Sequence, residues 1–352
     1  MPVTVSNPHR GQGLSLDAPF PCEDAGAVTR LLQRCPAHQE TPLLSVPALA
    51  AFCGVAKIHL KDERNRMGLG SFKALGAAHA IARAAQEVVE GDSWTTALKG
   101  RTFVTASAGN HGLSVAAGAA LFGAQAVIYL SETVPEGFAA RLRAKGAEVV
   151  RAGADYEASM VAAETAAEEN GWTLLSDSSW PGYTELPYRV MEGYLQMAAE
   201  VAQQIPEPPT HILLQAGVGG LAAAVAAHAR RVWGDAPQII VVEPEAAPAL
   251  VESIKAGAVV ETKGPVSAMG RLDCKTPSMI ALQGLARDAD LFVTLTEAEA
   301  AAAVATLEAE GLATTPSGGA GIAALIAGLA LPQDARVFAI LSEGPEEGTG
   351  DA

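Results

Sequence analysis

Short runs of β-branched and other apolar residues alternate along the chain with longer alanine-rich stretches whose apolar positions recur at helical spacing. Nine such runs predict strands. They lie at 58–62, 101–107, 126–131, 148–153, 172–177, 211–217, 238–244, 291–296 and 336–344. The helical patterns lie at 73–90, 112–122, 135–145, 156–170, 188–204, 220–233, 297–310 and 319–329. This alternation is typical of an α/β protein with mostly parallel sheets and flanking helices.

Nine strands are many for one doubly wound sheet, so the pattern predicts two lobes. The strand and helix units within 85–181 would form a smaller inserted domain, and 1–84 together with 182–352 would form the larger one. The first 40 residues or so are rich in proline and predict an extended arm before the first compact element. No sequence repeat is visible, which excludes solenoids and propellers.

Composition and charge narrow the kinds of partner and compartment that we expect. Of 352 residues, 49% are apolar and 18% are charged, which is enough apolar material for large cores. The net charge of −15 would repel nucleic acid and anionic membranes. No apolar window reaches the roughly 20 residues of a membrane span, and the N-terminus lacks the pattern of a secretory signal. We therefore expect a cytoplasmic protein that binds neither nucleic acid nor membranes.

The four cysteines are scattered along the chain, at Cys22, Cys35, Cys53 and Cys274. None of them forms a CxxC pair, and no histidine stands near them at the spacing of a metal ligand. The sequence therefore predicts neither a disulfide framework nor a metal site.

Loops that follow strands carry the candidate chemistry, because ligands of parallel sheets bind beyond the carboxyl ends of the strands. The first loop is glycine-rich and ends on Lys73, where a helix begins. This placement predicts a rigid lysine whose pKa is lowered toward covalent chemistry with a carbonyl group. A solvated lysine at a helix start is the alternative interpretation.

The second loop, Thr-Ala-Ser-Ala-Gly-Asn-His-Gly at 105–112, consists mostly of small residues. Its backbone N–H groups would approach an anion at the following helix start, and Asn110 offers both a hydrogen-bond donor and an acceptor. A plain turn explains the same residues. The fourth loop, 314–321, also opens a helix, and its Ser317 would either cap that helix or point its hydroxyl at a ring nitrogen.

The third loop, Gln-Ala-Gly-Val-Gly-Gly-Leu-Ala at 215–222, is the most glycine-rich of the four. Glycine amides at a helix start form a cradle for phosphate. The loop also imitates the dinucleotide-binding fingerprint, because the next strand ends near an acid, Glu243. The dinucleotide alternative explains this loop only and leaves Lys73, Asn110 and Ser317 without a role.

Taken together and in order, the motifs SFK, SAGNH, GVGG and PSGGAG resemble those of the fold type II, or β-family, of pyridoxal phosphate enzymes. This family includes tryptophan synthase β and threonine dehydratase. The resemblance runs from about residue 43 to about residue 344. It implies a two-lobed α/β fold, pyridoxal 5'-phosphate as cofactor, and a homodimer.

The resemblance also implies a role for each matching residue. Lys73 would hold the cofactor covalently and act as acid and base. The other implied roles are Asn110 for the ring hydroxyl, Gly217, Val218, Gly219 and Gly220 for the phosphate, Ser317 for the pyridine nitrogen, and Ser107, Gly109 and His111 for the substrate carboxylate. A neutral hydroxyl at the pyridine nitrogen would favour β-elimination over transamination.

Within that family, the segments 61–76, 174–194 and 270–278 resemble those of the diaminopropionate ammonia-lyases. This implies α,β-elimination of ammonia from a β-substituted amino acid such as 2,3-diaminopropionate, giving a 2-oxo acid and ammonia. Asp177 matches an acidic position suited to move a proton as the amine leaves, although a strand-end helix cap is the alternative. Ala108 stands where that group has an aspartate that acts on the Cα proton of one stereoisomer, so the resemblance does not carry over activity on the D-isomer and leaves another β-substituted substrate open.

Three alternatives remain open within this interpretation. The first is a hydroxyamino-acid dehydratase of the same fold, acting on serine, threonine or 3-hydroxyaspartate. The second is a synthase that replaces the β-substituent. The third is a protein that keeps the cofactor pocket but has lost turnover and serves as a binding module.

Overall fold

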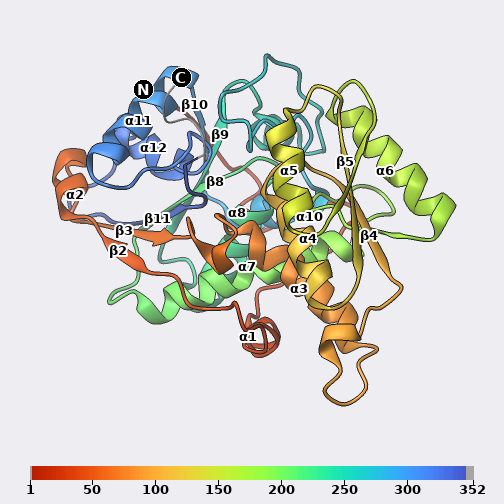
Figure 1. Ribbon diagram of the computed structural model, residues 1–352. Helices are drawn as coiled ribbons and strands as arrows, with labels where there is room; N and C mark the ends of the chain where they lie inside the picture. The colour runs from red at the N-terminus through yellow and green to blue at the C-terminus, as the bar shows by residue number, and fades with distance from the viewer. Residues whose placement is uncertain (1, 346–352) are drawn as a thin grey trace.

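The protein contains two β-sheets (Figure 1), and its structure, a computed structural model, describes residues 2–345. The larger sheet has seven strands in the order β1-β10-β9-β8-β11-β3-β2, and the smaller has four in the order β6-β5-β4-β7. The strands of the larger sheet are β1 (Val3–Ser6), β2 (Leu43–Ser45), β3 (Lys57–Asp62), β8 (His211–Gln215), β9 (Gln238–Pro244), β10 (Leu291–Leu295) and β11 (Arg336–Leu341). Those of the smaller are β4 (Thr102–Ala106), β5 (Gln125–Leu130), β6 (Glu148–Arg151) and β7 (Thr173–Leu174).

Both sheets are mostly parallel, as the sequence predicts. Every pairing in the smaller sheet is parallel, and in the larger sheet only the two edge strands, β1 and β2, run antiparallel to their neighbours. All nine predicted strands are present. The strands of the smaller sheet lie within 102–174, which agrees with an inserted domain at 85–181, although the domain boundaries themselves stay a prediction.

Helices cover both sheets and fill the space between them (Figure 1). Their bounds are α1 (Gly26–Leu32), α2 (Pro47–Cys53), α3 (Lys73–Gln86), α4 (Asn110–Leu121), α5 (Glu136–Ala144), α6 (Tyr156–Asn170), α7 (Glu185–Gln204), α8 (Gly220–Trp233), α9 (Ala249–Ala256), α10 (Met279–Asp288), α11 (Glu297–Ala309) and α12 (Ala320–Ile326). The largest core joins α3, α4, α7, α8 and α10 to one face of each sheet. A second core packs α2, α11 and α12 on the other face of the larger sheet, and a third packs α6 on the smaller one.

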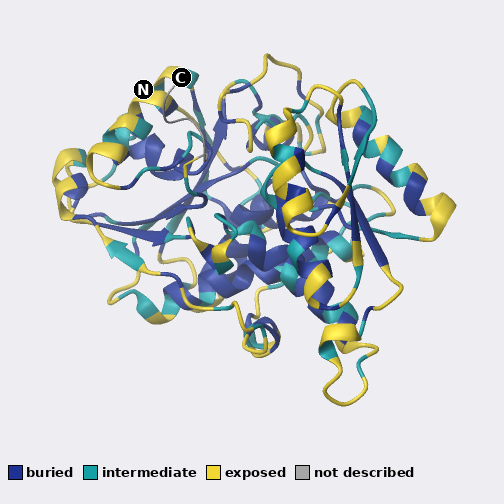
Figure 2. Cartoon of the chain, in the orientation of Figure 1, coloured by how far each residue is buried: buried dark blue, intermediate teal, exposed yellow. Residues whose placement is uncertain are grey.

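Burial follows these layers (Figure 2): the strands and the central helices are the most buried parts of the chain, and outer helices such as α6 expose one side. Among residues 2–345, no helix is both long enough and apolar enough to cross a bilayer.

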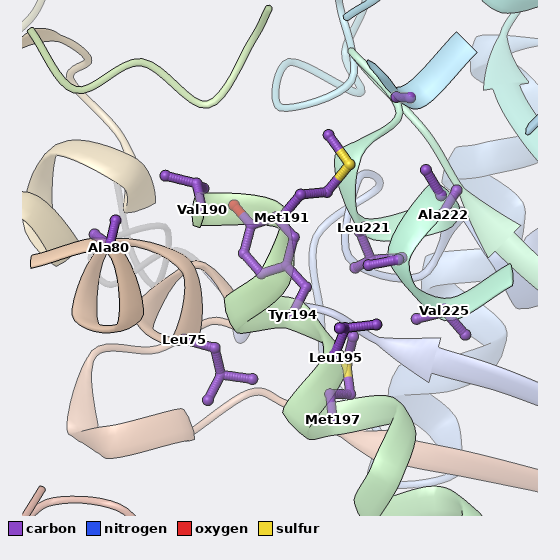
Figure 3. Packing of buried hydrophobic residues seen from close by; sticks show 14 of the residues in the cluster. Leu75, Ala80, Val190, Met191, Tyr194, Leu195, Met197, Leu221, Ala222 and Val225 are labelled. Carbon is purple, nitrogen blue, oxygen red and sulfur yellow. The ribbon is translucent and has the colours of Figure 1, made fainter. Parts of the chain in front are cut away.

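The helix that begins with Lys73 is fixed by a close crossing between α3 and α7 (Figure 3). A Cβ atom at Gly76 would lie 2.6 Å from the Tyr194 ring, and one at Gly193 would lie 2.3 Å from the Leu75 carbonyl oxygen. Both positions therefore require glycine for the two helices to approach so closely. Since α3 starts at Lys73, this crossing also fixes where the lysine stands relative to the larger sheet.

The N-terminal region is not the extended arm that its proline content suggests, and that expectation is wrong. Strand β1 pairs with β10 at the edge of the larger sheet, where its β-branched residues suit an extended strand. Helix α1 buries Val28, Leu31 and Leu32 in the central core. Both elements are short and gain their stability from packing rather than from local sequence, which is why the pattern search misses them.

Candidate active site

Three of the four predicted loops leave the carboxyl ends of strands, and these ends meet where the two sheets approach each other. The loop after β3 leads to Lys73, the loop after β4 leads to Asn110, and the loop after β8 leads to Gly220. The fourth loop, which carries Ser317, lies beside the end of β11, because Gly318 accepts a hydrogen bond from the Ser342 N–H. All four loops are therefore neighbours in space.

The first loop reaches Lys73 through a tight turn. Met67, Gly68 and Gly70 all have positive φ angles, of 53°, 66° and 81°. The N–H of Phe72 then donates to the carbonyl of Ser342 at 3.0 Å, which ties the start of α3 to the end of β11. The predicted rigid placement of Lys73 agrees with this geometry.

Lys73, which follows β3 of the larger sheet, forms an ion pair with Asp177, which follows β7 of the smaller sheet. Both side chains are about one fifth exposed, at 22% and 19%. Burial lowers the pKa of the lysine amine, but the Asp177 charge and Tyr194 outweigh it, so the pKa is raised overall. The expected lowering of this pKa is wrong for the protein alone, because the sequence does not show that Asp177 faces the amine. The same pair lowers the pKa of Asp177 although burial opposes it, so Asp177 is a carboxylate.

His111 lies beside this pair as a neutral imidazole. Burial lowers its pKa, and Lys73 lowers it further against the opposing effect of Asp177. Its Nε2 lies 2.8 Å from the carbonyl oxygen of Leu175, so this nitrogen carries the proton and donates it. The other ring nitrogen, Nδ1, is buried without a hydrogen-bond partner among the described residues. It is left to accept a hydrogen bond from a bound group.

The second loop brings Asn110 to the first turn of α4 and places Ser107 and Gly109 half-buried beside it. Close packing fixes the loop, because a Cβ atom at Gly112 would lie only 2.1 Å from the carbonyl oxygen of Ser107. The amide of Asn110 donates a hydrogen bond to the carboxylate of Glu343. The backbone N–H groups of this loop thus stand at the positive end of a helix, where an anion is stabilised.

The third loop has the form of a phosphate cradle. Gly219 has a φ angle of 97°, and a Cβ atom at Gly217 would lie 3.0 Å from the sulfur of Cys274. Within residues 2–345, the backbone N–H groups of Gly217, Gly219 and Gly220 make no hydrogen bond to the protein. These open donors at the start of α8 suit a phosphate group, and Cys274 lies near enough to Lys73 and Asp177 to interact with their charges. The residues present therefore fit pyridoxal phosphate.

Ser317 is buried and its hydroxyl accepts a hydrogen bond from the backbone N–H of Arg271 at 3.1 Å. It does not cap α12, whose capping residue is Gly319. Ser342 is a second buried hydroxyl near Ser317, and its backbone is hydrogen-bonded to Phe72 and Gly318.

Sequence reasoning missed four residues at this site. Glu343 and Ser342 follow β11, Thr315 donates to Glu343, and Arg271 lies near both Gly109 and Glu343. A search for polar residues directly after each strand finds Glu343 and Ser342, since they lie within the predicted 336–344 segment. Thr315 and Arg271 lie within the singled-out segments 314–321 and 270–278, but nothing in those segments indicates that the two side chains meet Glu343.

Glu243, the acid of the dinucleotide alternative, has a structural role. It is fully buried, and its two carboxylate oxygens accept the N–H groups of Leu250 and Val251, each at 2.8 Å, at the start of α9. Burial raises its pKa to about 8. The carboxylate that would hold a ribose therefore caps a helix instead. No three His, Cys, Asp or Glu side chains of residues 2–345 are grouped so as to hold a metal ion.

Comparison with known proteins gives the same picture. A model of the family described as "Pyridoxal-phosphate dependent enzyme" matches residues 35–343. The chain is 32% identical to diaminopropionate ammonia-lyase of Escherichia coli K12 over 89% of this chain and 86% of that protein. It is 28% identical to a mouse serine dehydratase-like protein over 86% of this chain and 87% of that protein. The crystal structure of the E. coli lyase in complex with D-serine matches with a TM-score of 0.88 and 29% identity, over 98% of this chain and 94% of that one.

These matches confirm the predicted fold type II architecture, the cofactor and the reaction class of ammonia elimination. They also leave the dinucleotide alternative without support, since the matched family uses pyridoxal phosphate. The chain belongs to the family of pyridoxal-phosphate dependent enzymes.

Proposed function

We propose that this enzyme eliminates ammonia from 2,3-diaminopropionate to give a 2-oxo acid and ammonia. The observation that carries the proposal is the position of an acidic side chain, Asp177, directly against the Lys73 amine. A protonated β-amine leaves as neutral ammonia without a further proton, whereas a β-hydroxyl needs a proton donor in order to leave. A carboxylate also attracts the positive charge of the β-ammonium group. Asp177 therefore suits an amine leaving group better than a hydroxyl.

The residues divide the work as follows. When bound, pyridoxal phosphate supplies the electron sink for the bond that breaks at Cα. Lys73 holds the cofactor and then moves the Cα proton at its Nζ atom, while Asp177 holds the leaving amine. The N–H groups of Gly217, Gly219 and Gly220 would bind the phosphate, and Asn110 would orient the cofactor ring. Val218, the fourth predicted donor, directs its N–H at the Cys274 sulfur in the structure and would have to turn from it to join them.

Substrate binding is assigned to the loop after β4. Ser107, Gly109 and His111 would hold the substrate carboxylate at the positive end of α4. Because His111 is neutral and its Nδ1 atom can only accept a hydrogen bond, it borders the substrate carboxylate by position and can accept a hydrogen bond from the substrate's amino group, and it does not supply a positive charge. His111→Gln is expected to raise KM more than it lowers kcat.

We propose Ser317 as the hydroxyl facing the pyridine nitrogen, with Ser342 as the second candidate. The Ser317 hydroxyl already accepts the Arg271 N–H, yet its proton is still free to be donated. Ser342 lies one residue beyond β11 and contacts Phe72, the residue before Lys73. We compare the visible absorbance of the bound cofactor in Ser317→Ala and Ser342→Ala. The variant in which this absorbance changes identifies the hydroxyl that faces the pyridine nitrogen.

A substrate panel tests the proposed function. Purified holoenzyme is supplied with D- and L-2,3-diaminopropionate, L-serine, L-threonine and the 3-hydroxyaspartates, and 2-oxo acid is measured for each. We expect the highest kcat/KM for L-2,3-diaminopropionate. A higher value for a hydroxyamino acid would favour the dehydratase, and a shift of the cofactor band without product from any of them would favour a binding module.

The residue before the Gly-Asn-His motif tests stereospecificity. Ala108 provides no base beside the substrate, so Lys73 is left as the group that removes the Cα proton and we expect preference for the L-isomer. Ala108→Asp adds a carboxylate in this loop and is expected to raise the D-to-L ratio of kcat/KM at least about tenfold. Ala108→Asn, which has the same shape without the charge, is the matched control and should leave the ratio unchanged.

We further propose that the protein is a cytoplasmic homodimer that binds neither nucleic acid nor membranes. The support is its net charge of −15 and its similarity to enzymes of small amino acids. Sedimentation equilibrium of the holoenzyme measures the assembly directly, and a monomer mass would contradict the dimer.

A further inference from the structure

Glu343 lies at the point where the loops of the site converge. It is two residues beyond β11, and its backbone forms an antiparallel bridge with Ser71 in the first loop, which leads to Lys73. Gly344, the next residue, donates its N–H to the carbonyl of Gly70 at 3.0 Å. The Glu343 carbonyl in turn accepts a hydrogen bond from the Thr314 hydroxyl at 2.6 Å. The backbone of Glu343 is thus tied to the first and the fourth loop.

The side chain of Glu343 joins the second loop to these two. One carboxylate oxygen accepts the amide N–H of Asn110, and the other accepts the hydroxyl of Thr315. The Nε atom of Arg271 lies 3.7 Å from the oxygen that Asn110 contacts. The side chain is only 7% exposed, and the carboxylate has little room to swing, because a Cβ atom at Gly318 would lie 2.9 Å from its Cγ atom.

A carboxylate in this place determines which way the amide of Asn110 points. An ionised carboxylate only accepts hydrogen bonds, whereas an amide has N–H donors on one side and an oxygen acceptor on the other. If the amide of Asn110 were reversed, its oxygen would face the carboxylate oxygen of Glu343 and the two would repel each other. Hydrogen bonds to a charged acceptor are also stronger than neutral ones, so the observed orientation is strongly preferred.

We propose that Glu343 is a positioning residue that fixes the amide of Asn110 so that its second N–H faces the ring hydroxyl of the cofactor. The proposal rests on the role assigned above to Asn110. Thr315 and Arg271 hold the Glu343 carboxylate, and Glu343 holds Asn110. The orientation of the cofactor ring is therefore set by residues from the larger sheet acting on a side chain of the smaller one.

The test is a double-mutant cycle with a spectroscopic readout. The pH midpoint of the visible absorbance of the bound cofactor is measured in the wild type, Asn110→Ala, Glu343→Gln and the double variant. Glu343→Gln keeps the shape of the side chain but accepts the amide in either orientation. The control is Glu308→Gln, an exposed carboxylate of α11 that lines the same cavity of about 380 Å³ as Glu343.

We expect Glu343→Gln to move the midpoint in the same direction as Asn110→Ala and to lower kcat about tenfold, the usual effect of losing one charge-assisted hydrogen bond. In the Asn110→Ala background it should add no further shift, because the two residues act through one contact. Glu308→Gln should leave the midpoint unchanged.

Two results would overturn the proposal: an unchanged midpoint in Glu343→Gln, or a shift as large in the Asn110→Ala background as in the wild type. If Asn110→Ala itself leaves the midpoint unchanged, the role of Asn110 fails first and this proposal fails with it. Thr315→Val, which removes one donor that holds the carboxylate, is the second variant should Glu343→Gln not fold. It should give a smaller shift in the same direction, and no shift would again contradict the proposal.

Discussion

Two groups of paired charges draw their cations from residues 61–73, and they are built in opposite ways. The first, which we call the closed cluster, consists of Lys61, Glu63, Arg66 and Glu200. All four side chains are 0% or 1% exposed. Arg66 alone donates to both carboxylates and to the carbonyl of Gln39 at 2.6 to 2.9 Å. The second, the open pair of Lys73 and Asp177, is about one fifth exposed.

The difference lies in how many hydrogen bonds are left to make. In the closed cluster every charge has a partner of opposite sign. The cluster therefore holds the first loop, which leads to Lys73, against α7 and leaves no unpaired charge for a ligand. In the open pair, Asp177 is the one counter-charge paired with the Lys73 amine among the described residues, and the Tyr194 hydroxyl interacts with the amine as well. The amine has three N–H donors, so at least one stays free. The closed cluster thus stabilises the fold, whereas the open pair leaves a donor free for a bound group.

The largest expected effect comes from breaking the open pair at its lysine. Lys73→Ala removes the group that holds the cofactor and moves the Cα proton, so turnover should fall by about 10⁴-fold or more. Borohydride reduction followed by mass measurement of the intact chain should show no cofactor attached to the variant. The control, Lys255→Ala, changes a half-exposed lysine on α9 and should keep both turnover and attachment. Turnover retained in Lys73→Ala would contradict its assigned role.

Breaking the closed cluster should damage stability instead. Arg66→Met leaves Glu63 and Glu200 buried without their main counter-charge, which should lower the free energy of unfolding by about 3–5 kcal/mol. Urea unfolding of the holoenzyme measures this change. Arg143→Met removes an arginine from an exposed pair with Glu136 and should cost less than about 1 kcal/mol. Equal effects of the two substitutions would show that closure of the cluster does not matter.

The acid of the open pair should affect rate and pH dependence more than stability. Asp177→Asn should lower kcat for diaminopropionate by about 10²–10³-fold. It also removes the charge that raises the pKa of Lys73, so the pH at which the amine of the cofactor-free chain loses its proton should move down. Lysine labelling of that form against pH measures the shift. The free energy of unfolding should change by no more than about 1 kcal/mol, because the partly exposed Lys73 can lose its proton to solvent. A loss of stability as large as that of Arg66→Met would contradict the distinction between the closed cluster and the open pair.

Glu243 is a third kind of buried acid, to be compared with those of the closed cluster. Its hydrogen bonds come from backbone N–H groups rather than from a cation. Burial raises its pKa from 4.5 to about 8, so the folded protein keeps a proton that the unfolded chain has lost. Stability should therefore fall as the pH rises from about 4.5 to about 8, by up to about 1.4 kcal/mol per pH unit. In Glu243→Gln this part of the slope should vanish in urea unfolding at several pH values. An unchanged slope would mean that Glu243 is ionised in the folded protein.

Much of the fold and of the site follows from local sequence. The nine predicted strands are all present because parallel strands buried on both faces are nearly continuous apolar runs. The four loops were found because each contains glycines at a helix start, which the sequence displays directly. The approach of Lys73 and Asp177 was not predictable in the same way, since it depends on how the two sheets pack.

The closed cluster shows the limit most clearly. Lys61, Glu63 and Arg66 look like solvated charges in the sequence. Their burial depends on Glu200 of the distant helix α7, which pairs with both Lys61 and Arg66, while Glu63 pairs with Arg66. Glu243 shows the same limit in another form, because its spacing from Gly217 imitates a nucleotide site while its carboxylate caps α9. In both cases a partner far away in the sequence decides the role of the side chain.

The most direct test of this account counts both products released by the holoenzyme from L-2,3-diaminopropionate. Elimination of the β-amine predicts two molecules of ammonia for each 2-oxo acid, one from Cβ and one from hydrolysis of the product. Release of 2-oxo acid from serine or threonine alone, with one ammonia each and none from diaminopropionate, would contradict it.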